Sequence, residues 1–117
     1  MDVKQLFIDV LETFGFPVFL QGSLQESDAY PDSFFTFWNN ETTDAAFFDN
    51  AETRTVWDFD LNFYSCNPAL VNSMLLEAKT ALKAQGFIVQ GKGYDVVSDE
   101  PTHTGRGINV TYIERGV

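Results

Sequence analysis

The chain has 117 residues, of which 44% are hydrophobic and 15% aromatic, including 12 Phe. This length suits one hydrophobic core, and the apolar content argues against intrinsic disorder. No apolar run approaches the roughly 20 residues that span a bilayer, and the N-terminal segment lacks the pattern of a signal peptide. We therefore expect a single domain over residues 1–117, made and kept in the cytoplasm.

Seventeen acidic residues against seven basic ones give a formal net charge of −10 at pH 7. This charge repels phosphate backbones and argues against sequence-specific binding of nucleic acid. An acidic wall could still surround a passing DNA duplex without holding it. The one cysteine, Cys66, excludes an intramolecular disulfide and a cysteine-rich zinc site.

The first element expected along the chain is an amphipathic helix. Its apolar side chains recur at the spacing of one helical stripe: Val3, Leu6, Phe7, Val10, Leu11 and Phe14. Asp2 can cap its start, and Gly15 ends it. Residues 18–20 and 33–38 then have the composition of short strands.

The longest strand signal runs from residue 53 to residue 64, where apolar and polar side chains alternate. One face carries Thr55, Trp57, Phe59, Leu61 and Phe63, and the other carries Val56, Asp58, Asp60, Asn62 and Tyr64. Alternation with a period of two predicts a sheet that is covered on one face and open to solvent or a partner on the other.

A second amphipathic helix is expected after Asn67, which can cap it, with Pro68 at its first position. Its apolar stripe consists of Leu70, Val71, Met74, Leu75, Ala78 and Leu82. Gly86 ends this helix, because glycine readily adopts the backbone conformation found just beyond a helix C-terminus.

Residues 87–89, 94–97 and 108–113 are the remaining strand candidates, and they could form one interrupted hairpin. The order of helices and strands predicts an α+β fold. We expect a two-layer domain in which a mixed, largely antiparallel sheet carries both amphipathic helices on one face.

Two segments stay outside this scheme. Residues 39–52 are too long for a tight turn and hold Phe47 and Phe48, an aromatic pair that either packs under its own domain or contacts a partner. Residues 98–107 are expected to form a mobile loop with a permissive backbone at its glycines. In that loop Arg106 is expected to pair with a carboxylate across an interface.

Paired acids and a lone histidine are the candidates for chemistry. Asp58 and Asp60 lie about 7 Å apart on one strand face, which could suit hydrolysis, although acids on a solvated strand face are routine. His103, near Asp99 and Glu100, lacks the set spacing of metal-ligand motifs. We therefore expect no catalytic, metal or cofactor-binding residues.

Several segments, in their order and spacing, carry a resemblance that covers nearly the whole chain. They are residues 14–18 (FGFPV), 30–38 (YPDSFFTFW), 56–65 (VWDFDLNFYS), the helix after Asn67, and residues 84–87 (AQGF), 95–100 (DVVSDE) and 104–108 (TGRGI). In this arrangement the chain resembles the tail-terminator family of siphophages, also called tail-completion or head–tail joining proteins, whose members are short α/β proteins.

The resemblance implies a non-enzymatic structural protein that forms a hexameric ring, caps the completed tail tube and offers a docking surface to the head. It implies the tail tube protein and a head-completion or neck protein as partners, with DNA passing through the ring. The protein would sit at the head-proximal end of the virion tail after assembly in the host cytoplasm. On this hypothesis the subunit or tail-tube interface uses Phe47, Phe48, His103 and Arg106, and the acids facing the lumen or a partner are Asp58, Asp60, Asp99 and Glu100.

Three alternatives remain open. The chain could be another neck or head–tail connector component. It could be a small hydrolase that uses the face of Asp58 and Asp60 or the loop of His103, in which case carboxylates should converge on a pocket. It could also be a small acidic inhibitor or regulatory protein that mimics nucleic acid and binds a basic partner stoichiometrically, without forming a ring.

Overall fold

The computed structural model describes the backbone of residues 2–20, 31–46, 53–96 and 102–115, and the side chains of residues 2–20, 31–40, 55–96 and 102–114. In chain order the elements are α1 (Val3–Glu12), β1 (Val18–Leu20), β2 (Ser33–Ala46), β3 (Thr53–Ser65), α2 (Pro68–Ala84), β4 (Ile88–Val89), β5 (Tyr94–Val96) and β6 (Thr104–Arg115).

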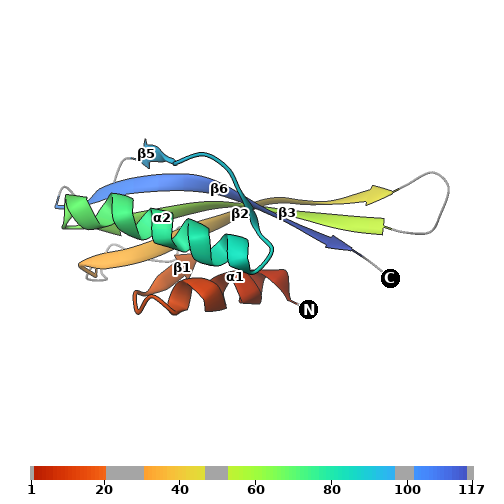
Figure 1. Cartoon of the computed structure of the whole chain (residues 1–117), viewed down its shortest axis with the longest axis horizontal. Helices are drawn as coiled ribbons and strands as arrows, with labels where there is room; N and C mark the ends of the chain where they lie inside the picture. Colours follow the sequence, from red (N-terminus) through yellow and green to blue (C-terminus); the bar gives the residue numbers. More distant parts are fainter. Residues whose placement is uncertain (1, 21–30, 47–52, 97–101, 116–117) are drawn as a thin grey trace.

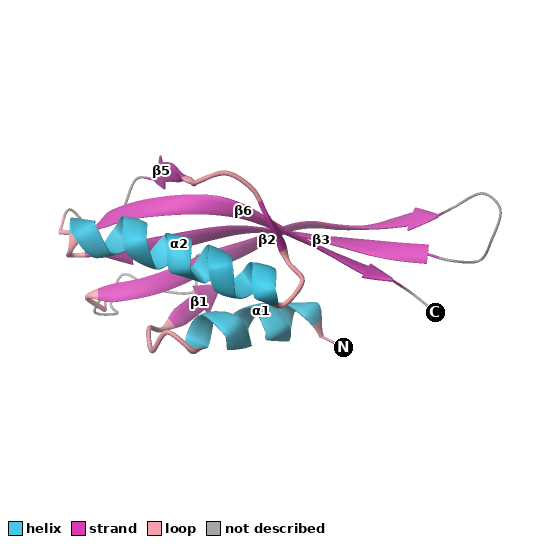
Figure 2. Cartoon of the chain, viewed as in Figure 1, coloured by secondary structure: helices cyan, strands magenta, loops and turns pink. Residues whose placement is uncertain are grey.

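The strands form one sheet in the order β1-β2-β3-β6-β4, and β5 also pairs with β6. β1 runs parallel to β2, whereas every other described pair is antiparallel. Both helices lie on the same face of this sheet (Figures 1 and 2). The expected α+β fold, with a mixed and largely antiparallel sheet, is therefore confirmed.

Local signals set the limits of both helices. The Asp2 carboxylate accepts a hydrogen bond of 3.1 Å from the backbone N–H of Gln5, which satisfies a donor that α1 leaves free at its start. Asn67 caps α2 in the same way through the N–H of Ala69, at 3.1 Å. Gly86, just beyond α2, has a φ of +96°, a conformation that glycine adopts without strain.

The core lies between the two helices and the face of the sheet that they cover. Phe7 of α1 stacks on Phe59 of β3 with 4.4 Å between ring centroids, and it meets Phe37 at 5.5 Å and Phe87 at 5.8 Å. Such aromatic contacts stabilise a fold beyond the area that they bury. The buried side chains of α2 are Val71, Met74, Leu75, Ala78 and Leu82. Five of the six residues of the predicted second stripe are therefore buried, and Leu70 packs at its edge.

Two strands are longer than the sequence patterns predicted. β2 continues to Ala46, where a loop from residue 39 was expected, because it pairs with β3 past a bulge between Asn39 and Thr42. β6 begins at Thr104 instead of residue 108, because its first residues also pair with β3. Backbone pairing with β3 therefore extends both strands beyond their apolar alternation. Phe47 and Phe48 lie outside the described residues.

One end of the sheet projects beyond both helices (Figure 1). We define this end as the arm: residues 43–46 of β2, 53–56 of β3 and 113–115 of β6, which are cross-strand neighbours. The molecule extends over 54 × 28 × 22 Å and has a radius of gyration of 15.5 Å, compared with about 13 Å for a compact domain of similar length. The arm accounts for this elongated shape.

The packing predicts which side chains stabilise the domain. Phe59→Ala should lower the free energy of unfolding by about 3–5 kcal/mol and Leu75→Ala by about 2–5 kcal/mol, because both leave cavities in the core. Leu76→Ala is the matched control, since Leu76 is the exposed neighbour of Leu75 on α2. Chemical denaturation would measure all three, and equal losses for Leu75→Ala and Leu76→Ala would contradict the assigned helix face.

Candidate functional site

The face of the sheet opposite the helices is the candidate site, and we call it the open sheet face. Asp58 and Asp60 of β3 point to this face because the core residues Phe59 and Leu61 alternate with them. The pairing of β3 with β6 places Thr111 opposite Asp58 and Asn109 opposite Asp60. The period-two pattern of β3 thus separates an apolar core from an acidic surface.

Hydrogen bonds hold the Asp58 carboxylate from both neighbouring strands. One oxygen accepts from Nδ2 of Asn40 at 2.9 Å, and the other accepts from Nδ2 of Asn109 at 2.9 Å and from Oγ1 of Thr111 at 3.2 Å. Asn109 also donates to Asp60 at 3.3 Å. These donors are neutral, so they fix the carboxylates without cancelling their charge.

Neither carboxylate forms an ion pair with a side chain that the structure describes. The ion pair found among those side chains joins Arg106 to Asp95. Partial burial raises the pKa of the Tyr94 phenol above its usual value of 10.0, and the charges of Asp60 and Asp58 raise it further. The negative field of the two acids therefore extends to β5.

Exposed apolar side chains surround the acids. Trp38 is 49% exposed, Tyr94 48%, Ile88 43% and Ile113 41%. Strand register places Trp38 opposite Asp60, Ile88 opposite Thr111 and Ile113 opposite Val56, all on the open sheet face.

A hollow of about 310 Å³ lies beside the acids on this face, lined by Ile88, Gln90, Asn109 and Thr111. Apolar side chains gathered around a few fixed polar groups are typical of surfaces that bind another macromolecule. The open sheet face has this character.

Gly105 and Gly107 belong to strand β6, which corrects the expected loop over residues 98–107. Neither glycine has a positive φ, so a permissive backbone is not the reason for them. A Cβ at residue 105 would lie 2.5 Å from Cδ1 of Tyr64, and one at residue 107 would collide with Oδ1 of Asn62. The glycines let the side chains of β3 lie across β6, and the remainder of the expected loop, up to residue 101, lies outside the described residues.

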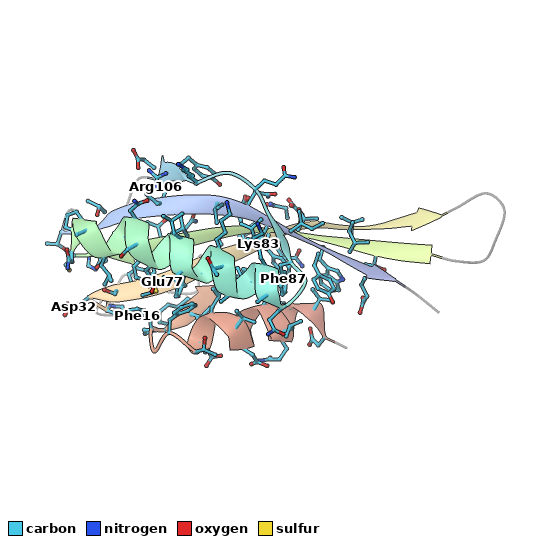
Figure 3. The ribbon with its side chains drawn as sticks, in the orientation of Figure 1. Phe16, Asp32, Glu77, Lys83, Phe87 and Arg106 are labelled. Carbon is cyan, nitrogen blue, oxygen red and sulfur yellow. The ribbon has the colours of Figure 1, made fainter. Side chains whose placement is uncertain are left out.

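Arg106 pairs within its own chain, and its expected pairing across an interface stays a prediction. Its Nη1 lies 2.7 Å from Oδ1 of Asp95, and its Nη2 donates to the backbone oxygen of Lys92 at 3.1 Å. Figure 3 shows Arg106 beside β5. The guanidinium therefore fastens β5 and the turn before it to β6.

His103 is buried, with 8% of its surface exposed, and it holds chain segments together at one end of the sheet. Its Nε2 donates to the backbone oxygen of Pro31 at 2.8 Å, and its Nδ1 lies 3.0 Å from Oγ1 of Thr102. Cys66 Sγ is 3.5 Å from Nε2. These contacts give His103 a structural role within its own chain, and its expected place in a subunit or tail-tube interface stays a prediction.

The acids that the sequence grouped with His103, Asp99 and Glu100, lie outside the described residues. Among the residues that are described, no group of three or more His, Cys, Asp or Glu side chains is arranged to hold a metal ion. Within the same residues, no helix is long and apolar enough to cross a membrane.

No protein-family model matches the chain, and no curated protein matches it significantly. The function of the chain must therefore be inferred from its residues and their geometry.

Most of the site was not recognisable in the sequence. Asp58 and Asp60 were candidates, but Asn40, Asn109 and Thr111, which hold them, were not. Asn109 and Thr111 alternate with the buried Ile108 and Val110, so their shared face could be read from β6 alone. Their position beside the acids depends on strand order and register, which that alternation does not contain.

The close approach of Tyr64 to Gly105 can be tested by adding one methyl group. Gly105→Ala should lower the free energy of unfolding by about 1–3 kcal/mol, because the new Cβ and the ring cannot both keep their places. In a Tyr64→Ala background the same substitution should cost less. Equal losses in the two backgrounds, measured by chemical denaturation, would show that the ring is not the obstacle.

The field of the acids can be measured through Tyr94. Asp60→Asn should lower the pKa of Tyr94 toward its ordinary value, because one of the charges that oppose the phenolate is removed. An ultraviolet titration, taken as the difference between each protein and its Tyr94→Phe variant, isolates this phenol. Glu77→Gln is the control, since Glu77 lies on α2 (Figure 3), and an unchanged Tyr94 pKa in Asp60→Asn would contradict the assignment.

The sign of the accompanying stability change follows from the direction of the shift. Because the folded chain binds the Tyr94 proton more tightly, the unfolded chain releases it first as the pH rises. The contribution of Tyr94 to stability is thus complete below pH 10.0 and falls as the pH rises toward the raised pKa. Asp60→Asn should bring the folded and unfolded pKa of Tyr94 closer together, and so narrow the pH range over which this contribution is lost.

Proposed function

We propose that the chain is a non-enzymatic structural protein that assembles into a ring, caps a completed phage tail tube and presents a docking surface to the head. The phage setting, and the expectation that each ring contains six subunits, come from the resemblance to tail-terminator proteins. The observation that carries the proposal is the arm, a piece of sheet that extends beyond the helices of its own domain (Figure 2).

The strand edges of the arm favour a contact between subunits. β1 pairs with β2 only at residues 35–37, and β4 pairs with β6 only at residues 110–111, so the described strands leave both outer edges of the arm unpaired. Unpaired edges present rows of backbone donors and acceptors that another chain can satisfy. A projecting set of three strands without a helix against it gains the most from such a contact.

The shape and charge of the molecule also suit a ring. An arm at one end that meets a different surface of the next copy makes a head-to-tail contact, and repeated contacts of this kind close a ring or extend a filament. With a net charge of −10, the wall of such a ring would repel DNA passing through it. Asp58 and Asp60 are the described acids that we place on a partner-facing or lumen-facing surface.

The hydrolase alternative receives less support from the geometry. Asp58 and Asp60 lie on an extended sheet and are hydrogen-bonded by Asn and Thr side chains of the adjacent strands. The described residues that line the hollow beside them are Ile88, Gln90, Asn109 and Thr111, and none of these four is a carboxylate. Convergent acids in a pocket, which a hydrolase would need, are not what these residues form.

Assembly can be tested on the isolated protein and on tail tubes. Light scattering over a range of concentrations should show a rising molar mass, and negative-stain images should show rings at high concentration. The protein should also bind the open ends of tail tubes, whereas tails that are already capped are the control. A protein that stays monomeric at every concentration and ignores open tubes would refute the proposal.

A further inference from the structure

We propose that the open sheet face binds a basic segment of a partner protein, with an arginine or lysine side chain directed at Asp58 and Asp60. The apolar stem of this side chain lies in the hollow beside the acids. The inference rests on the proposed docking function and names the chemistry of the partner that docks.

Two negative charges are held in place on the open sheet face. Neither Asp58 nor Asp60 forms an ion pair with a described side chain. The side chains that donate hydrogen bonds to them, Asn40, Asn109 and Thr111, are neutral, so they position the carboxylates and leave their charge. Groups that are already held in place lose little freedom when a partner arrives. A cationic side chain therefore meets an ordered pair of acceptors.

The hollow of about 310 Å³ adjoins these charges. Asn109 and Thr111 belong to its lining and also donate to Asp58, so the hollow reaches the groups that hold this carboxylate. Ile88 adds an apolar wall, and Gln90 adds an amide. Arginine and lysine have the same division, since an apolar stem carries a charged head. The hollow and the acids together therefore fit a long cationic side chain.

Half-exposed aromatic rings lie on strands to either side of β3. Trp38 of β2 is opposite Asp60, and Tyr94 belongs to β5, which pairs with β6 on the other side. A cation that meets a carboxylate gains further from the face of an aromatic ring. Exposed aromatic side chains are also enriched where proteins bind one another. A protein segment can use the rings and the acids together, whereas a metal ion would use the acids alone.

The charge of the whole chain narrows the class of partner. A net charge of −10 repels the phosphates of nucleic acids and of anionic lipids, and it attracts basic proteins. Net charge by itself attracts any cation to any part of the surface. The fixed acids, the hollow and the rings concentrate the attraction on the open sheet face, and they favour a partner that carries apolar groups as well as positive charge.

A titration with a defined basic peptide tests the docking. The probe is a short peptide in which arginine and valine alternate, and nuclear magnetic resonance of isotope-labelled protein follows its binding. The backbone amide signals of Ile88, Asn109 and Thr111 should shift as the peptide is added. The same peptide with glutamate in place of arginine should leave them unchanged. Shifts that are spread over both helices instead of this face would overturn the docking.

Matched variants separate the docking from an effect of net charge. Asp60→Lys should weaken binding of the arginine peptide by at least about tenfold, because like charges then meet. Asp60→Asn keeps the shape of the side chain and should weaken binding in the same direction, and Trp38→Ala should weaken it by about threefold. Glu77→Lys changes the net charge as Asp60→Lys does, but Glu77 is exposed on α2, on the opposite side of the sheet (Figure 3). Equal losses in Asp60→Lys and Glu77→Lys would overturn the docking.

The outcomes distinguish this docking from the proposed ring, which sedimentation velocity measures on the same samples. Rings that form normally in a protein that does not bind the peptide would overturn the docking alone. Peptide binding at this face by a chain that never forms rings would support the docking and overturn the ring. Spermine that shifts the same amide signals as strongly as the peptide would show a general attraction for cations, and it would overturn the docking of a protein.

Discussion

The pairing of β3 with β2 on one side and β6 on the other is the interaction on which the rest of the structure depends. β3 lies in the middle of the sheet, and its alternation sends Phe59, Leu61 and Phe63 into the core. The same alternation sends Asp58 and Asp60 to the opposite face. One strand therefore provides both the central layer of the fold and the acids of the candidate site.

The neighbours of β3 decide what its polar face can do. Asn40 reaches Asp58 from β2, whereas Asn109 and Thr111 reach it from β6. At the other end of the sheet, Gly105 leaves space in β6 for the ring of Tyr64. The polar side chains hold the acids in place, and the glycine of β6 makes room for a large side chain of β3. The result is an ordered, charged surface, which is suited to a partner of opposite charge.

The elongated shape separates the open sheet face near the acids from the projecting end of the sheet. The helices cover one face of the body and stop short of the arm (Figure 1). Asp58 and Asp60 lie on the open sheet face, where no described side chain forms an ion pair with them.

The helices, their caps, the apolar face of β3 and the α+β class could be predicted from the sequence alone, because they depend on local periodicity and on residues close together in the chain. The continuation of β2 and β6 into an arm, the pairing of Arg106 with Asp95 and the burial of His103 became apparent only from the folded chain. Each of these depends on which strands become neighbours and in what register. Periodicity assigns a side chain to a face, but it does not say what lies beside it, because that choice is made by backbone pairing between distant segments.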